Sequence, residues 1–143
     1  MLIERRARIS DRAWLWDLYQ DLLKKPITQQ WGWDIEFQKK GFNTNLSYDK
    51  FKIISIDDED VAAYILNEEP DHLYLKMLLV ARPHQGKGIG RRIISTLIAI
   101  SKARSLPIRL SVIKANPVDG FYLRQGFVET SEADGSTKFE FAP

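Results

Sequence analysis

Three alternating glycines, Gly86, Gly88 and Gly90, most constrain what this chain can fold into. They follow residues 72–80, an apolar run with the length of a buried strand, and they precede a segment with apolar side chains at helical spacing. The apolar positions of that segment are Ile93, Ile94, Leu97 and Ile98. The pattern therefore predicts a strand, a glycine-rich loop and an amphipathic helix in direct succession.

Further strands and helices flank this unit on both sides. Sequence patterning predicts strands over residues 2–9, 48–56, 61–67, 72–80 and 108–114, and a final strand pair ending near Phe141. Helical spacing predicts additional helices over residues 10–26, 27–40 and 118–125. Ser10 is the expected N-cap of the first helix, Pro26 its end, and Gly41 the end of the second. This order predicts an α/β or α+β fold, a mixed sheet with helices against it, in a single domain over residues 1–143.

The composition excludes several classes of function. A net charge of +2 on 143 residues gives no reason to expect nucleic-acid binding, because that binding rests on many phosphate contacts. The absence of cysteine excludes disulfides, thiolate zinc sites and an acyl-cysteine route, and no metal site is expected. The N-terminus lacks the apolar core of a signal peptide, and no apolar run is long enough to span a bilayer. A cytoplasmic protein without a membrane partner is therefore expected.

The glycine-rich loop fits two interpretations. A Walker A loop requires GxxxxGK followed by Ser or Thr, and that pattern is absent. A dinucleotide fingerprint beginning at Gly86 would need a third glycine at position 91, which is Arg91. What remains is either a backbone nest that presents N–H groups to a pyrophosphate at the start of a helix, or a plain turn that caps a surface helix.

Two segments resemble the signatures of the GCN5-related N-acetyltransferases, the GNAT family. Residues 85–90, QGKGIG, are similar to the family's Gln/Arg-x-x-Gly-x-Gly/Ala motif and lie between a strand and a helix, as that motif does. Downstream, Asn116 and residues 121–127, FYLRQGF, resemble the family's Asn…Phe-Tyr…Gly-Phe block. With the preceding strand, the resemblance covers residues 72–128.

The resemblance implies a mostly antiparallel central sheet with one splayed parallel strand pair, flanked by helices. It also implies transfer of an acetyl group from acetyl-CoA to a primary amine. The pantetheine would lie along the end of the apolar strand, and the pyrophosphate would lie on the glycine loop. The residues expected to bind the cofactor are Leu78, Leu79, Val80, Gln85, Gly86, Lys87, Gly88, Ile89, Gly90, Arg91 and Asn116.

The chemistry expected from the resemblance needs a proton donor and a proton acceptor. Tyr122 matches the family tyrosine that protonates the departing thiolate, although an aromatic residue here is also suited to simple packing. Many family members carry a glutamate where this chain has Lys76, and a charged lysine cannot accept the amine's proton. The alternatives are a water chain, a substitute base in the neighbouring turn (Glu68, Asp71 or His72), or an anionic acceptor bound by Lys76.

Aromatic residues near the first two helices are candidates for the acceptor site. Trp31 and Trp33 lie two positions apart and cannot share a helix face, so at least one is expected to face the cleft. Trp14 and Phe37 are expected in the core instead. The acceptor is expected to be an amine of a small molecule, peptide or protein, and the acyl group can be acetyl or longer. The alternative is a CoA-binding module without efficient catalysis. The resemblance also allows a homodimer.

Overall fold

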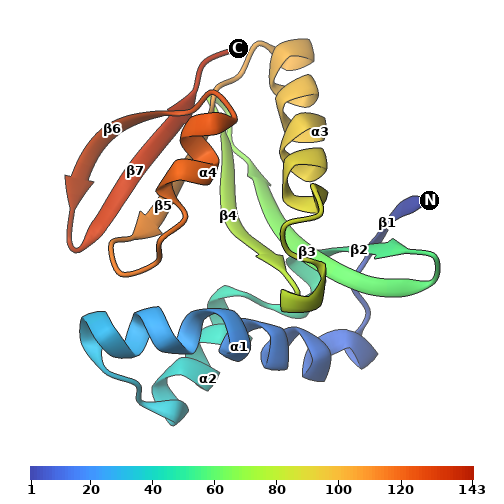
Figure 1. Cartoon of the computed structure of the whole chain (residues 1–143), viewed down its shortest axis with the longest axis vertical. Helices are drawn as coiled ribbons and strands as arrows, with labels where there is room; N and C mark the ends of the chain where they lie inside the picture. Colours follow the sequence, from blue (N-terminus) through green and yellow to red (C-terminus); the bar gives the residue numbers. More distant parts are fainter.

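A seven-stranded sheet runs through the structure, a computed structural model that describes residues 1–143 (Figure 1). Its strands are β1 (Leu2–Arg6), β2 (Lys52–Ile56), β3 (Glu59–Glu68), β4 (Leu73–Val80), β5 (Ile108–Ile113), β6 (Val128–Ala133) and β7 (Ser136–Phe141). The spatial order is β1-β2-β3-β4-β5-β7-β6, and only the β4–β5 pair is parallel. The predicted fold class, a mostly antiparallel sheet with one parallel pair, is therefore confirmed.

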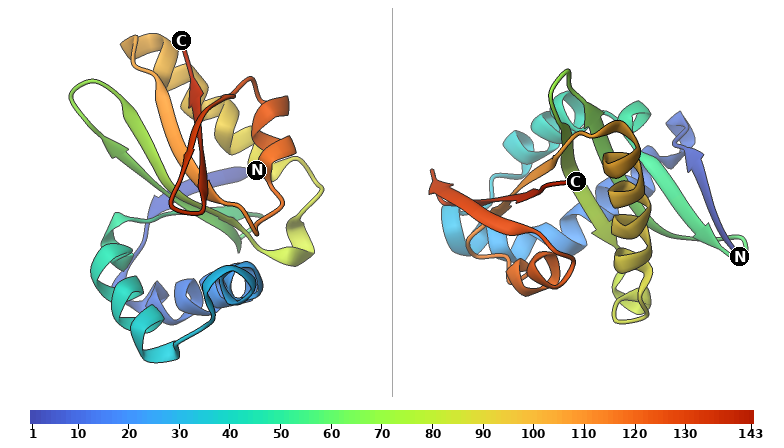
Figure 2. Two further views of the ribbon diagram at one scale, coloured as in Figure 1. Left: turned by 90° about the vertical axis from the view of Figure 1, so that its left-hand side faces the viewer. Right: turned by 90° about the horizontal axis from the view of Figure 1, so that it is seen from above.

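Helices cover both faces of this sheet. They are α1 (Arg12–Trp31), α2 (Ile35–Asn45), α3 (Ile89–Arg104) and α4 (Asp119–Arg124). The first two pack on one face and the last two on the other, as Figure 2 shows from two sides. None of these helices combines the length and the apolar character that a membrane crossing requires.

Each face of the sheet has its own hydrophobic core, and β3 contributes to both. Ala62 and Tyr64 belong to the core under α3 and α4, whereas Ala63 and Ile65 belong to the core under α1 and α2. Successive residues of a strand point to opposite faces, so a strand buried on both sides reads as a continuous apolar run. This explains why residues 61–67 show no polar alternation.

The first helix is longer than the sequence predicts. The expected end at Pro26 is wrong, because α1 continues through this buried proline to Trp31. Proline removes one helical hydrogen bond, but Pro26 and its neighbour Ile27 are both buried, and this packing compensates. The break instead occurs at Gly32, whose φ of 85° is a conformation that glycine adopts without strain.

The second helix also differs from its predicted range. It begins after Asp34, whose carboxylate accepts the Phe37 N–H, and continues through Gly41 to Asn45. Ser10 does not cap α1, because it lies in a short 3-10 turn before that helix. The sequence pattern identified both helices and misplaced the connection between them. That connection matters because it forms a pocket.

Candidate active site

The parallel strands β4 and β5 separate after only two residue pairs. Leu73 lies opposite Ile108 and Tyr74 lies opposite Arg109, and no pairing follows. Beyond this point β4 remains paired with β3, and β5 with β7, so each strand has one edge facing the gap between them. The divergence is visible between the β4 and β5 labels in Figure 1. The sheet thus contains an opening lined by backbone groups that have no strand partner.

A bulge in β4 lies beside this opening. Met77 is opposite Ile65 and Leu75 is opposite Leu66, which leaves Lys76 as the extra residue of the strand. The ammonium of Lys76 donates a hydrogen bond of 2.8 Å to the carbonyl of Asn45, at the end of α2. A cation is favourable there because the last carbonyls of a helix carry partial negative charge. The Lys76 side chain therefore connects the β4 bulge to the end of α2.

The glycine loop connects β4 to α3 and exposes a row of backbone donors. Gly86 and Gly88 have φ values of 75° and 82°, and Gly88 is the left-handed N-cap of α3. None of the backbone N–H groups from Gly86 to Arg91 donates a hydrogen bond within the protein. Free N–H groups at the start of a helix form a site for anions, reinforced by the helix dipole. The loop therefore fits a pyrophosphate.

The third glycine of the loop has a different role, which is packing. A Cβ atom built on Gly90 lies 3.2 Å from Cζ of Phe121 and 3.8 Å from Cγ2 of Val80. Phe121 belongs to α4, so this contact joins the first turn of α3 to the helix that carries Tyr122. The two sequence motifs, separated by about thirty residues in the chain, meet at this contact.

Side chains fix the loop to the rest of the fold. Gln85 donates from Nε2 to the carbonyl of Val80 at 2.9 Å. Arg82 pairs with Asp21 of α1 at 3.1 Å, and His84 pairs with Glu59 at 2.7 Å. In contrast, no carboxylate pairs with the basic side chains that follow, which are Lys87, Arg91 and Arg92. Their charges are available to phosphate groups.

Tyr122 lies on α4 in the core between aromatic rings. It is 8% exposed and contacts Phe121, Phe127 and Phe139, with ring centroids 5.1, 5.7 and 6.1 Å away. Burial raises the pKa of Tyr122 above its usual range, so the phenol stays protonated at neutral pH. Its hydroxyl makes no hydrogen bond within the protein, yet it is not among the fully enclosed polar atoms.

Asn116 lies in the turn that follows β5, near the start of α4. Its backbone N–H donates to the carbonyl of Ile113 at 2.9 Å, and its own carbonyl accepts from Val118 at 2.9 Å. These bonds hold the turn in shape. The side-chain amide of this half-buried residue has no hydrogen-bond partner in the protein.

The alternative bases in residues 68–72 lie at the wrong end of β4. Glu68 forms an ion pair with Arg104, and Asp71 bonds to His72 at 2.7 Å. The bond from His72 holds the pKa of Asp71 below its usual range. All three residues adjoin the start of β4, where β4 and β5 are still paired, whereas the opening lies toward the other end. The structure does not bring them to the gap.

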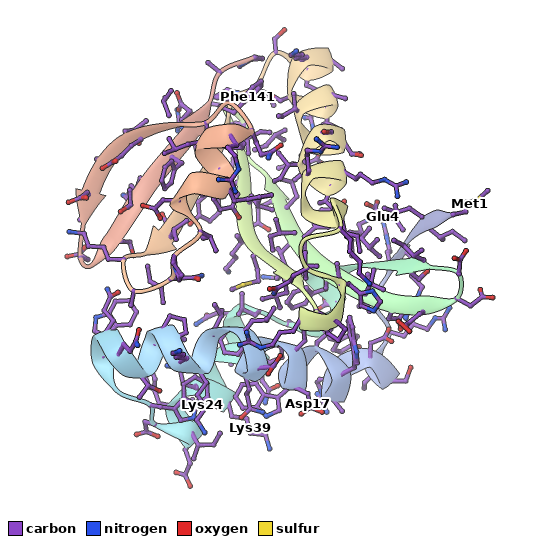
Figure 3. The ribbon with its side chains drawn as sticks, in the orientation of Figure 1. Met1, Glu4, Asp17, Lys24, Lys39 and Phe141 are labelled. Atoms are coloured by element: carbon purple, nitrogen blue, oxygen red, sulfur yellow. The ribbon has the colours of Figure 1, made fainter.

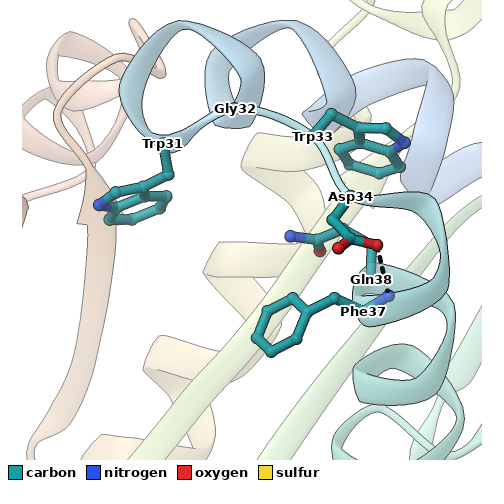
Figure 4. A pocket seen from close by; sticks show the side chains of 6 residues that line it. All are labelled: Trp31, Gly32, Trp33, Asp34, Phe37 and Gln38. Atoms are coloured by element: carbon teal, nitrogen blue, oxygen red, sulfur yellow. Dashed lines mark hydrogen bonds between the residues drawn. The ribbon is translucent and has the colours of Figure 1, made fainter.

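The connection between α1 and α2 forms a pocket of about 370 Å³ (Figure 4). It is lined by Trp31, Gly32, Trp33, Asp34, Phe37 and Gln38. Trp31 is 59% exposed and Phe37 is 72% exposed, so the prediction that Phe37 lies in the core is wrong. Trp33 is half-buried and stacks on Trp16 at 6.4 Å, with its indole N–H buried without an acceptor. Trp14 packs partly buried against the core under α1 and α2, as expected.

A polar clamp fixes the end of α1 to distant loops. Gln30 accepts from the Ala115 N–H at 2.9 Å and donates to the carbonyl of Gly135, at the tip of the β6–β7 turn. The same carbonyl accepts from the Lys114 N–H at 3.0 Å. Gln38 was expected near the acceptor site as a hydrogen-bonding side chain, whereas the sequence analysis did not identify Gln30 or Asp34. No local pattern marks Gln30, since its role arises from contacts between distant segments, and Asp34 was missed because the helix break was misplaced.

Residues 12–127 match the sequence profile of the acetyltransferase (GNAT) family. The chain belongs to this family. The assignment confirms the resemblance that the glycine loop and residues 116–127 carry, and with it acetyl transfer as the general reaction and coenzyme A as the cofactor. The splayed β4–β5 pair of this GNAT protein agrees with the architecture that the resemblance implies.

Solved structures share the fold of this GNAT protein. The PaiA N-acetyltransferase from Thermoplasma acidophilum, solved with coenzyme A, has a TM-score of 0.80 and 18% identity over 100% of this chain and 99% of its own. PH1933 from Pyrococcus horikoshii OT3 has a TM-score of 0.78 and 16% identity over 100% and 99%. The ribosomal-protein-S18-alanine N-acetyltransferase from Escherichia coli has a TM-score of 0.68 and 16% identity over 99% and 94%. At these identities the likeness shows the fold alone. A comparison with curated protein sequences gives no match.

Proposed function

We propose that this GNAT protein transfers the acetyl group of acetyl-CoA to a primary amine of a small molecule or peptide by direct attack of the amine. The observation that carries the proposal is the row of partnerless N–H groups from Gly86 to Arg91 beside the gap between β4 and β5. The chain has no cysteine, so its chemistry does not pass through an acyl-cysteine.

The cofactor residues divide by the part of coenzyme A that they suit. The unpaired edge of β4 at Leu78, Leu79 and Val80 offers backbone groups to the amides of the pantetheine. The N–H groups of the glycine loop, with the charges of Lys87 and Arg91, suit the pyrophosphate. The amide of Asn116, which has no partner in the protein, is suited to bind the same cofactor from the turn after β5. Bound acetyl-CoA supplies the acetyl group as a thioester.

The attacking ammonium loses two protons in the proposed reaction, and the departing sulfur gains one. Tyr122 holds a proton at its hydroxyl for the departing sulfur, and its raised pKa keeps that proton in place at neutral pH. The first proton of the ammonium passes to water, because Lys76 occupies the place of the common glutamate and bonds to Asn45. The second proton of the nitrogen restores the Tyr122 hydroxyl. Lys76 then acts on the acceptor site through α2, as a positioning residue.

The acceptor enters on the side of α1 and α2. Trp31 offers an exposed ring to the acceptor, and the half-buried Trp33 supports that pocket from behind through its stack on Trp16. The solved structures of this fold are named for different activities, so the fold does not identify the amine. The cytoplasmic location, the single domain over residues 1–143 and the homodimer stay predictions.

The proposal is tested by two measurements on the native protein. Acetyl-CoA at a hundredfold excess over its Kd is expected to add about 2.7 kcal/mol to the free energy of unfolding, seen as a rise in Tm. A panel of primary amines with acetyl-CoA is then expected to release free thiol, detected with a thiol reagent. The absence of any rise in Tm would refute the assignment of the loop.

A second candidate is a CoA-binding module without efficient catalysis. Lys76 in place of a carboxylate favours it, because an ammonium that donates to the Asn45 carbonyl cannot accept the proton of the amine. In that case coenzyme A raises Tm while no amine in the panel releases thiol above the rate of spontaneous hydrolysis. The two measurements therefore separate the two candidates.

A further inference from the structure

The pocket between α1 and α2 combines two exposed rings with one unpaired carboxylate. Trp31 lies at the end of α1, Phe37 lies on α2, and the Asp34 carboxylate at the start of α2 is turned toward the Phe37 N–H (Figure 4). Both rings are largely exposed, and they belong to neighbouring segments that line one pocket. Gln38 completes the lining, and its side-chain oxygen is already held by the Tyr19 hydroxyl at 3.1 Å.

The charge of Asp34 is not neutralised within the protein. One carboxylate oxygen accepts the Phe37 N–H at 3.1 Å and caps α2, and no Lys, Arg or His forms an ion pair with the residue. The next acidic side chain along the helix, Glu36, is also without an ion pair. The pocket therefore presents negative charge beside aromatic rings, an arrangement that attracts cations.

The same connection already holds one cation from the protein. The ammonium of Lys24 lies 5.8 Å from the ring centroid of Trp33. Lys24 projects from α1 on the side away from the sheet (Figure 3). This intramolecular contact shows the type of interaction that the exposed rings of the pocket can make with an external ammonium.

The end of α1 is held in place, so the pocket is preformed. Gln30 precedes Trp31 and bonds to both Ala115 and Gly135. A Cβ built on Gly135 lies 3.3 Å from Cζ2 of Trp31, so the β6–β7 turn closely approaches the indole ring. A polypeptide has no room to pass between α1 and this turn. The geometry favours a small acceptor that enters the pocket end-on.

We propose that the pocket holds the distal end of the acceptor, and that this end carries a second positive charge. The inference rests on the proposed N-acetyltransferase function and specifies its substrate class. One amine reaches the gap between β4 and β5, the chain between the charges lies along Trp31 and Phe37, and the distal ammonium meets Asp34. In the reaction, the reacting ammonium loses one proton to water, the amine nitrogen forms a bond to the acetyl carbon, the carbon–sulfur bond breaks, and the sulfur takes the proton of Tyr122. The second proton of the nitrogen passes through solvent to restore the Tyr122 hydroxyl.

Three probes of matched length test the substrate class. Cadaverine carries an ammonium at its far end, n-pentylamine carries a methyl group, and δ-aminovalerate carries a carboxylate. The expected kcat/KM falls in that order, with cadaverine about tenfold above n-pentylamine, as expected for one partly desolvated cation contact. Equal values for cadaverine and n-pentylamine would overturn the inference while leaving the proposed function intact.

The Asp34→Asn variant tests the assigned carboxylate. Asparagine caps helices as well as aspartate does, so α2 keeps its N-cap and the fold is retained. The ratio of kcat/KM for cadaverine to that for n-pentylamine is expected to fall close to one. Asp17→Asn is the matched control, because it removes one exposed, unpaired acidic charge from α1 outside the pocket, and it should keep the native ratio. A native ratio in Asp34→Asn refutes the inference.

A binding measurement decides the inference even without turnover. Calorimetric titration of the coenzyme A complex with the same probes is expected to show tighter binding of cadaverine than of n-pentylamine, with the difference lost in Asp34→Asn. If no probe is acetylated but this difference is present, the proposed reaction fails and the cation pocket stands. If the difference is absent, the pocket assignment fails.

Discussion

At the residue scale, the glycine loop contains glycines of two kinds. Gly86 and Gly88 have positive φ and open space around their α-carbons, so they give the loop the backbone shape on which the proposed anion site depends. Gly90 has no such conformation and is instead confined by Phe121. The family motif thus combines a requirement for ligand binding with a requirement for packing, and substitutions separate the two.

Gly90→Val tests the packing requirement. The valine Cβ starts 3.2 Å from the Phe121 ring, so α4 must move away, and a loss of about 1–3 kcal/mol in the free energy of unfolding is expected. Denaturant unfolding measures this loss. Gly120→Ala is the matched control, since its Cβ meets only the flexible end of the Arg124 side chain. Equal stability of the two variants would contradict the packing role.

Tyr122→Phe tests the proton donor. The Tyr122 hydroxyl has no hydrogen-bond partner in the protein, so its removal is expected to leave Tm and the affinity for coenzyme A nearly unchanged. If this hydroxyl protonates the sulfur, kcat falls at least about tenfold. Steady-state kinetics with the best amine of the panel measure the change. An unchanged kcat would assign Tyr122 to packing alone.

At the scale of elements, the connection between helices differs most from the sequence prediction. Proline is a strong local signal for a helix end, and burial of Pro26 and Ile27 overrides it. The strands were easier to predict, because the apolar runs of β3 and β4 have no competing interpretation of similar strength. Consequently the glycine loop could be predicted from sequence motifs, whereas the pocket between α1 and α2 could not.

Lys76→Met tests the link between the β4 bulge and α2. Loss of the bond to the Asn45 carbonyl is expected to cost about 0.5–1 kcal/mol of unfolding free energy and to raise KM for the amine, because α2 carries part of the proposed acceptor pocket. Lys76→Arg, which can still donate to that carbonyl, should restore both values. Complete loss of activity with unchanged stability would instead show that Lys76 contacts the substrate directly.

At the scale of the whole molecule, one side chain joins three distant segments. Gln30 lies 105 residues from Gly135 and 85 residues from Ala115, and it bonds to both. A single sequence contains no signal for such a contact, because glutamine on a helix end is common and its partners are backbone atoms. The overall fold was predictable from motifs and periodicity, and the bonds that join Gln30 to Ala115 and Gly135 were not.

Gln30→Ala tests this closure. The Ala115 N–H loses its acceptor, which costs about 1–3 kcal/mol if it stays buried, and Trp31 loses its fixed position. KM for the amine is expected to rise while the Kd of coenzyme A is unchanged, since the glycine loop lies elsewhere. Gln29→Ala, one residue earlier and exposed, is the control. A rise in the Kd of coenzyme A instead would contradict the proposed division of the site.

The short pairing between β4 and β5 has a consequence for handling the protein. Beyond their two paired residues, β4 and β5 each have an edge whose backbone groups lack a strand partner. Most proteins have no such unpaired edges in the interior of a sheet. Another chain can pair with such an edge, which is a common beginning of aggregation. Coenzyme A is expected to occupy these groups in the manner of an added strand. The cofactor-free protein should therefore aggregate faster than the loaded protein, as light scattering during incubation would show.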